Sequence, residues 1–398
     1  MSKRRMYGLL AFIIFTFSLL AVVIIYEAGD FSWNNKGKNN SIVGDRNSGS
    51  EENTTAVPKP SEPENSQVSE GSVTEVPKPT VTEEPWKDIT MLFTGDIYLS
   101  DVVVNAYKGK GIEAIVEKGL LSEMQGADLT MSNQEFAFST GGTAAEDKQY
   151  TFRVNPDYIT AFQDMGIDIV TLANNHTMDF GLTALEDSFD TLNGAGIDYV
   201  GAGSNLSDAR KIHYSENQGK TIAFLAASRV IPVYEWNAAE NKAGLFTTYD
   251  PTLLLEDIKT ASENSDYVVV YLHWGIERAE LPKDYQHSLA KQYIDAGADL
   301  VIGSHPHVLQ GVEYYKGKPI VYSLGNYIFY SNIQRTAVLK ITLDEDMNTK
   351  LQLLPAKAEN AMTKLLSDTE EISQFYKYME SISFGVGFDE SGYAFELQ

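Results

Sequence analysis

Short apolar runs rich in β-branched and aromatic residues alternate with amphipathic stretches from Trp86 onward. This alternation restricts the chain more than any other feature, because strands that alternate with helices pack as an α/β layered fold. The expected strands are 89–93, 128–131, 167–172, 221–226, 267–272, 300–302 and 319–323. The expected helices are 156–165, 181–195, 253–263 and 285–296, and two of them are followed by glycines suited to a helix C-terminus, Gly166 and Gly297.

Side chains that can bind metals or transfer protons follow five of these strands. In chain order, the loops contain TGD with Asp96; SNQE with Asn133 and Glu135; ANNH with Asn174, Asn175 and His176; HWGIE with His273 and Glu277; and GSHPH with His305 and His307. Ligands of α/β sheets bind outside the carboxyl ends of the strands. The five loops are therefore expected to converge on one crevice.

His305 and His307 flank Pro306, which keeps the segment out of a helix. On an extended backbone, positions i and i+2 point to the same side, so both imidazoles are expected to face one centre, about 2.0 to 2.1 Å from a metal. The alternative is a pair of surface histidines. Four of the six histidines lie in the strand-end loops, which favours the metal site. His213 and His287 lie elsewhere and are expected to be solvated or locally hydrogen-bonded.

Oxygen donors complete the candidate metal site. Asp96 can instead cap a helix or turn, Glu135 can pair with a lysine, and Asn175 can cap the helix that starts near Asp179. Together with the histidines, they form an oxygen and nitrogen set suited to two divalent ions such as manganese, iron or zinc. Two such ions about 3.5 to 4 Å apart share a bridging water and lower its pKa. A nearby histidine outside the ligand set can protonate the leaving group.

Other residues near these motifs have weaker assignments. Asn174 and Asp179 are expected to shape their loop, with Asp179 starting the following helix, and Asn326 in YSLGNYIF is expected to support the rim. The candidate substrate-binding residues are Arg153, Asn133, Trp274 and Glu277. Arg153 can equally be an exposed structural arginine, and packing is the better interpretation for a lone aromatic such as Trp274.

The first residues of the chain resemble a membrane anchor. Lys3, Arg4 and Arg5 precede an uncharged apolar stretch over residues 7–26, about the 20 residues that cross a bilayer. Positive charge ahead of the span favours a cytoplasmic N-terminus, with the rest of the chain outside the cell membrane. A cleaved signal peptide is the alternative, although the residues after Ile25 offer a poor cleavage site.

A polar segment follows, rich in Ser, Asn, Glu, Pro and Thr, with a near repeat in AVPKP and EVPKP. It contains too little apolar surface to offset its ordering entropy, so we expect a disordered stalk. Four segments are therefore expected: a cytoplasmic tip and transmembrane anchor (1–27), a linker (28–86), a globular domain (87–345) and a C-terminal extension packed on that domain (346–398).

Composition excludes several kinds of function. The chain has no cysteine, which rules out disulfides, thiolate catalysis and cysteine-based zinc sites. Its net charge of -24 argues against nucleic acid or anionic lipid as the main partner. An anionic substrate remains compatible, because bound metal reverses the local field.

The ordered motifs TGD, N-x-E, LANNHxxDxG, HWGxE, GSHPHVLQG and YSLGN support a resemblance to a known family. Over residues 89–329 the chain resembles the capsule-synthesis family called CapA or PgsA, the membrane-anchored component of poly-γ-glutamate capsule systems, within the calcineurin-like metallophosphatase superfamily. The resemblance implies a four-layer α/β/β/α sandwich of the metallophosphoesterase type. Membrane synthase or export subunits and an anionic surface polymer are the partners it implies.

The resemblance also implies roles for individual residues. Asp96, Glu135 and His307 would serve one metal, with Glu135 bridging to a second metal served by Asn175, His273 and His305, and His176 would be the proton donor. The chain departs from the superfamily pattern in two places. Tyr98 stands where a histidine is usual, and Asn133-Gln134-Glu135 replaces the usual bridging aspartate motif. These departures predict that one metal is under-coordinated or absent, which counts against phosphoester hydrolysis.

Three functional hypotheses follow. The leading one is an extracytoplasmic, membrane-tethered hydrolase-like domain that acts in synthesis, export or attachment of an anionic polymer such as poly-γ-glutamate. If catalytic, it would hydrolyse an amide or phosphoester bond. The second is a non-catalytic subunit that binds polymer or scaffolds a membrane synthase. The third is a free-standing phosphodiesterase or nucleotidase.

Overall fold

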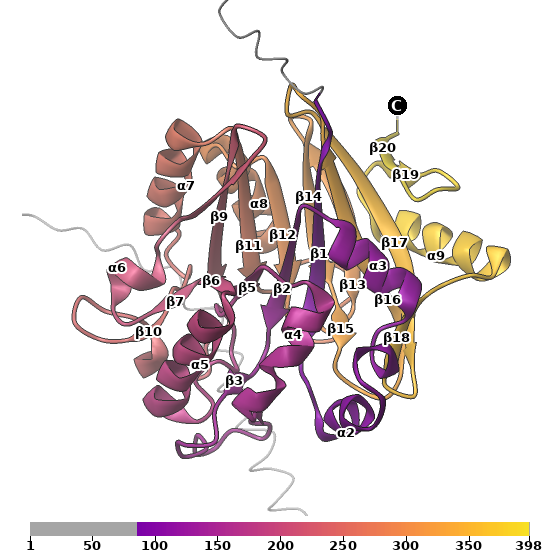
Figure 1. Cartoon of the computed structure of the whole chain (residues 1–398). Coiled ribbons are helices and arrows are strands. Elements are labelled where there is room, and N and C mark those ends of the chain that lie inside the picture. Colours follow the sequence, from indigo (N-terminus) through magenta and orange to yellow (C-terminus); the bar gives the residue numbers. More distant parts are fainter. Residues whose placement is uncertain (1–85, 398) are drawn as a thin grey trace, which may run out of the picture. The chain divides into compact units, whose positions relative to one another are not determined.

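The computed structural model describes residues 86–397, in which helices alternate with strands of two mixed β-sheets (Figure 1). The α/β fold expected from the sequence is confirmed. Within the described residues no helix is both long enough and apolar enough to span a membrane. The expected anchor over residues 7–26 and nearly all of the expected linker lie outside the described residues.

The first sheet has eight strands in the order β18-β17-β16-β1-β2-β5-β6, with β15 also pairing with β1. β1, β2, β5 and β6 run parallel to one another, and β16, β17 and β18 continue the sheet with antiparallel pairing. Their bounds are β1 Ile89–Ile97, β2 Leu129–Gln134, β5 Ile169–Thr171, β6 Asp198–Val200, β15 Asn326–Ile328, β16 Ile333–Leu343, β17 Thr349–Glu359 and β18 Met362–Leu365.

The second sheet has six strands in the order β13-β14-β12-β11-β9-β8. The inner strands β14, β12, β11 and β9 are parallel, and the two edge strands are antiparallel to their neighbours. The bounds are β8 His213–Asn217, β9 Lys220–Ser228, β11 Tyr267–His273, β12 Leu300–Ser304, β13 Leu309–Tyr315 and β14 Lys318–Leu324. Three short pairs complete the strands: β3 Ala137–Phe138 with β4 Arg153–Val154, β7 Ala202–Gly203 with β10 Gly244–Leu245, and β19 Val386–Phe388 with β20 Ala394–Glu396.

The helices connect the strands. The α-helices are α2 Asp101–Lys110, α3 Lys118–Gly126, α4 Thr160–Met165, α5 Gly181–Ala195, α6 Leu206–Ala209, α7 Thr252–Asn264, α8 Asp284–Ala296 and α9 Thr369–Ile382, and the 3-10 turns are η1 Ile112–Ala114, η2 Pro156–Ile159 and η3 Tyr234–Trp236. α4 and α8 end, as expected, at Gly166 and Gly297, whose left-handed backbone suits a residue without a Cβ.

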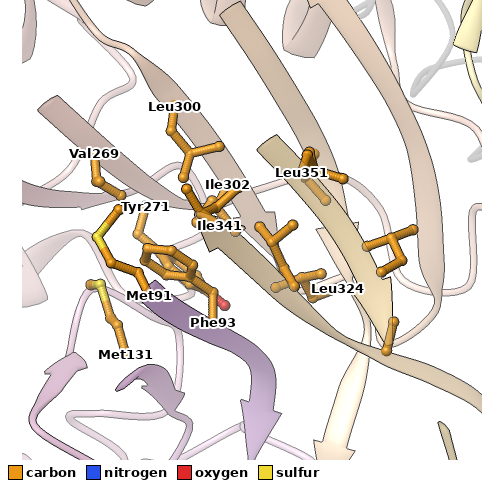
Figure 2. Packing of buried hydrophobic residues seen from close by; sticks show 14 of the residues in the cluster. Met91, Phe93, Met131, Val269, Tyr271, Leu300, Ile302, Leu324, Ile341 and Leu351 are labelled. Atoms are coloured by element: carbon orange, nitrogen blue, oxygen red, sulfur yellow. The ribbon is translucent and has the colours of Figure 1, made fainter. Parts of the chain in front are cut away.

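The main core lies between the two sheets. Met91, Phe93 and Met131 from the first sheet pack against residues of the second sheet that include Tyr271 and Ile302, and each is at most 1% exposed (Figure 2). A second core joins the first sheet to α3, α4 and α5, and a third joins the second sheet to α7 and α8. Helices therefore cover the outer faces of the two sheets, and the inner parallel strands, such as β1, β2, β11 and β12, are buried on both faces, as parallel strands require.

The C-terminal residues are part of these layers. β17 pairs with β16 along its length, and α9 packs Phe375, Met379 and Ile382 into the core between the sheets. The last long strands of the chain, β16 and β17, thus extend the first sheet beyond β1.

Candidate metal centre

Five strands deliver polar side chains to one place. Asp96 is the penultimate residue of β1, Glu135 follows β2, and Asn175 lies in the loop after β5. His273 is the last residue of β11, and the residues His305 and His307 follow β12. Because these strands are parallel within each sheet, both sheets present the carboxyl ends of their strands to the same crevice.

The carboxylates and imidazoles form two overlapping trios. Ligand atoms of Glu135, His273 and His305 lie within 4.8 Å of one another, and the same holds for Asp96, Glu135 and His307. Glu135 Oε1 is 3.6 Å from His273 Nε2, and Glu135 Oε2 is 3.7 Å from His307 Nδ1. The Glu135 carboxylate therefore lies between the two trios, with one oxygen facing each.

Glu135 is the test of whether these residues fit a metal. Both of its oxygens are fully buried and have no hydrogen-bond partner among the described residues. Burial, with Asp96 as a neighbouring negative charge, holds the pKa of Glu135 well above its usual range. A buried carboxylate is unfavourable without a partner, and a cation in contact with it would supply one. The buried donor set of carboxylates and imidazoles thus fits a divalent metal.

The His273 trio is poised to donate lone pairs. His273 Nε2 lies 3.1 Å from His305 Nδ1, and 2.7 Å from the amide oxygen of Asn175. Burial and the neighbouring His305 lower the pKa of His273, and burial lowers the pKa of His305 to about 3. Both rings are neutral near pH 7, which is the state that binds metal. Ser304 Oγ, 3.1 Å from His273 Nδ1, fixes the ring from behind.

The Asp96 trio is different in charge. His307 Nδ1 lies 3.2 Å from Asp96 Oδ2 and 2.8 Å from Asn326 Oδ1. Burial lowers the pKa of His307, but the carboxylates of Glu135 and Asp96 outweigh it and raise that pKa to about 10. Asn326, expected only to support the rim, thus contacts this trio directly.

The backbone around Pro306 differs from the expectation. His305 and His307 have positive φ angles of 96° and 58°, so the segment is a tight bend and not an extended strand. The argument that positions i and i+2 point to one side of a strand is therefore wrong here. The bend sends the two rings to different trios, with ring centroids 5.9 Å apart.

A glycine before Asp96 makes room for this geometry. A Cβ on Gly95 would lie 1.8 Å from the carbonyl oxygen of Gly325, which accepts a 2.8 Å hydrogen bond from the Asp96 backbone nitrogen. Only glycine allows β1 to approach the turn before β15 this closely. The close approach brings Asp96 beside Asn326, its parallel partner in the strand register.

His176 lies at the edge of the centre. Its Nε2 is 4.0 Å from Glu135 Oε1, and its Nδ1 donates to Asp179 Oδ2 at 2.7 Å. Asp179 was expected to start the next helix, which is wrong: α5 begins at Gly181 after Phe180, and no side chain caps it. The Asp179 carboxylate instead orients His176, a role that the spacing of three residues in NHTMD could have suggested.

Sequence reasoning missed Lys148 and Phe152, which come from the loop before β4 and contact this pair. The Lys148 ammonium forms an ion pair with Asp179 Oδ1, and the Phe152 ring stacks on His176 with centroids 4.0 Å apart. The Tyr98 ring stacks on Phe152 with ring centroids 4.1 Å apart.

The candidate substrate-binding residues occupy different surroundings. A cleft of about 450 Å³ is lined by residues that include His176, His307, Tyr330, Arg278 and Glu277. Asn133 does not line this cleft: it is fully buried and donates to Asp96 Oδ1 at 2.8 Å, so its contact is with a candidate ligand.

Arg153 and Trp274 do not line this cleft. The Arg153 guanidinium donates to the Gly141 carbonyl at 2.6 Å and lies over the Phe180 ring. Trp274 is 0% exposed in the core beside α8 and donates to the Tyr322 carbonyl at 3.0 Å. Both positions fit the structural alternatives.

The two remaining histidines are outside the centre. His213 lies in β8 and is 3.8 Å from Asp198, and His287 lies in α8 with its Nδ1 3.0 Å from Glu313. His287 is thus locally hydrogen-bonded, whereas His213 is partly exposed and its distance to Asp198 exceeds that of a hydrogen bond.

Fold and site together define an α/β protein with mixed sheets and a buried carboxylate–histidine centre at the ends of its parallel strands. Residues 90–331 match the family of the bacterial capsule synthesis protein PGA_cap, and the chain belongs to this family.

Relatives with known names agree with this assignment. The chain is 32% identical over 274 residues to the PGA biosynthesis protein CapA of Bacillus subtilis (strain 168), covering 68% of this chain and 71% of that protein. It is 29% identical over 301 residues to the capsule biosynthesis protein CapA of Bacillus anthracis, covering 73% of this chain and 72% of that one.

Solved structures are more distant. A phosphatase of Mycoplasma pneumoniae aligns with a TM-score of 0.45 and 13% identity, covering 74% of this chain and 99% of that one. The NAD nucleotidase of Haemophilus influenzae aligns with a TM-score of 0.42 and 11% identity, covering 77% and 65%. At these scores the likeness carries no argument about activity.

Proposed function

We propose that this chain is a membrane-tethered, extracytoplasmic protein that acts on an anionic capsule polymer, most simply poly-γ-glutamate, through a dinuclear metal centre. Membership of the PGA_cap family and the names of the two Bacillus relatives support the polymer class. The apolar stretch at residues 7–26 supports the tether. The domain would be a four-layer sandwich of the metallophosphoesterase type, and the polymer and a membrane synthase or export subunit would be its partners.

The observation that carries the metal proposal is the Glu135 carboxylate. It is fully buried, its two oxygens have no hydrogen-bond partner among residues 86–397, and each faces a different histidine. Such a group fits a bridging ligand between two divalent ions. Asp96 and His307 would be the other ligands of one ion. Asn175, His273 and His305 would be the other ligands of the second ion.

The chemistry proposed is hydrolysis of an amide or phosphoester bond in the polymer. Two divalent ions, when bound, supply an activated water and stabilise negative charge on the attacked group. His176 would take up on its Nε2 the proton that the attacking water loses and pass it to the leaving group, because Nε2 faces the centre while Asp179 holds the Nδ1–H. The cleft beside His176 and His307 would hold the polymer, with Arg278 and Glu277 at its wall.

Metal analysis of the purified full chain tests this proposal. We expect one to two equivalents of a divalent metal in protein prepared without chelator, and none in the variant His305→Ala with His307→Ala. His213→Ala is the matched control, because His213 lies in β8 outside both trios, and it should keep its metal.

Polymer production in cells carrying the same variants separates the functional alternatives. Loss of polymer together with metal supports the proposal. Metal loss with unchanged polymer contradicts it and favours a scaffold subunit. Hydrolysis of a generic phosphodiester by purified protein as fast as polymer would favour a free-standing phosphodiesterase.

A further inference from the structure

Lys148 is a nearly buried cation beside the candidate proton donor. Its side chain is 13% exposed, and burial lowers the pKa of the ammonium, partly offset by Asp179. Its Nζ pairs with Asp179 Oδ1, donates to the Asn175 carbonyl at 2.5 Å, and lies 3.1 Å from His176 Nδ1. A lysine that loses most of its hydration needs partners of this kind.

Phe152, four residues after Lys148, also contacts His176 and Asp179. The Phe152 ring stacks on the imidazole, and the Phe152 backbone nitrogen donates to Asp179 Oδ2 at 2.6 Å. Asp179 therefore accepts from Lys148 on one oxygen and from Phe152 and His176 on the other. Lys148 and Phe152 thus both contact the pair formed by His176 and Asp179.

We infer that Lys148 is a positioning residue for His176: it locks Asp179 and the Asn175 carbonyl so that His176 Nδ1 stays engaged and Nε2 faces the centre. The role in proton transfer rests on the proposed function, but the geometric lock does not. Lys148 belongs to neither trio, and its three polar contacts are all to the loop that follows β5, while its Nζ also lies 5.4 Å from the centroid of the Trp236 ring. Removing its ammonium would leave one Asp179 oxygen buried without a donor, so the carboxylate would turn and release His176.

The lock can be measured by the reactivity of His176 in the full chain. Diethyl pyrocarbonate modifies unprotonated imidazoles, and peptide mass spectrometry gives the rate at each histidine. In Lys148→Met we expect the His176 rate to rise at least about threefold, while the His213 rate stays unchanged. Lys148→Arg, which keeps a donor, should restore much of the wild-type rate. Lys108→Met, at an exposed position of α2, is the matched control and should leave His176 unaffected.

Asp179→Asn provides a second route if Lys148→Met does not fold. It removes the negative charge of Asp179 that pairs with Lys148. It should therefore also raise the modification rate of His176. A wild-type His176 rate in a folded Lys148→Met or Asp179→Asn variant would overturn the inference. These rates decide it even in a chain that binds no metal, so failure of the metal proposal and failure of the lock are distinguishable.

Cellular polymer output connects the lock to function. If His176 is the proton donor, Lys148→Met should lower polymer output without lowering metal content, and Lys148→Arg should recover part of it. A loss of both metal and output in Lys148→Met would contradict a role that acts only through His176.

Discussion

His273 Nε2 and Asn175 Oδ1 lie 2.7 Å apart although 98 residues separate them in the chain. His273 is the last residue of β11 in the second sheet, and Asn175 lies in the loop after β5 of the first sheet. Neither residue is exposed to solvent by more than 7%. A nitrogen and an oxygen donor are thus fixed together where one ion could contact both.

Asn175→Ala should remove one of these donors and weaken one metal only. We expect the purified variant to lose about half of the wild-type metal, because Asp96, Glu135 and His307 remain as the other trio. Inductively coupled plasma mass spectrometry of the purified chain measures this. Complete retention of metal would show that Asn175 is not a ligand.

Glu135→Gln should separate the stability of the metal-free fold from that of the metal-bound protein. A metal present at about 100 times its Kd stabilises a fold by about 2.7 kcal/mol. At about 2 to 4 °C per kcal/mol, chelator should lower the wild-type Tm by about 5 °C or more. The variant should not respond to chelator, and its metal-free Tm should equal or exceed that of metal-free wild type, because the buried charge repelled by Asp96 is gone. Calorimetry with and without chelator measures both Tm values. A Glu135→Gln variant whose Tm falls with chelator as much as that of wild type would count against Glu135 as a ligand.

Metal binding near pH 7 should release protons. The pKa of His307 is raised to about 10, so its ring is charged in the metal-free protein and must lose a proton to bind. His305, with a pKa of about 3, has no proton to lose. Affinity should therefore increase with pH, and titration calorimetry in two buffers should show about one proton fewer for His307→Ala. In the metal-free fold the raised pKa of His307 is stabilising below pH 6.5, and this contribution is lost as the pH rises through about 10.

Gly95→Ala should destabilise the fold and the centre together. The new methyl group would overlap the Gly325 carbonyl, so β1 would move away from β15 and displace Asp96. We expect a loss of about 1 to 3 kcal/mol and reduced metal content. Gly194→Ala is the matched control: it lies in α5 with nothing within 4 Å of the added Cβ, and it should stabilise by about 0.5 to 1 kcal/mol. Denaturant unfolding compares the two, and equal effects would contradict the close-approach argument.

Arg153→Ala and Trp274→Phe should test whether these two candidate substrate-binding residues have a structural role instead. Arg153 is engaged with Gly141 and Phe180, so its removal should leave polymer output unchanged. Trp274→Phe should lower stability by about 1 to 3 kcal/mol through lost packing and a lost donor, with metal content unchanged. A drop in polymer output for a stably folded Arg153→Ala would return Arg153 to the substrate site.

Periodicity predicted the elements whose pattern is local. Residues 181–195 coincide with α5, and 267–272 with all but the last residue of β11, since hydrophobic spacing alone defines a helix face or a buried strand. β16 and β17 were not predicted, although β16 is long. β16 pairs with β1, which is distant in sequence, and β17 pairs with β16. A local residue pattern does not specify such pairing.

The candidate site divides in the same way. The positions of Asp96, Glu135 and His273 at the carboxyl ends of expected parallel strands predicted them, because ligands of α/β sheets bind there. The sequence did not predict a role for Lys148, because this residue lies in an irregular loop and reaches the site only through tertiary folding. The bend at Pro306 was predicted wrongly for a related reason: positive φ angles are uncommon outside glycine, and those of His305 and His307 depend on their tertiary surroundings.

The two trios draw their residues from both sheets, and this has a consequence for the order of assembly. Asp96 and His305, which contact each other through the His305 backbone nitrogen, are 209 positions apart. Loop closure over such a span is slow, and neither sheet alone carries a complete set of donors. A complete set of donors for an ion therefore exists only after the sheets have docked. An ion bound there would contact residues of both sheets and stabilise their interface.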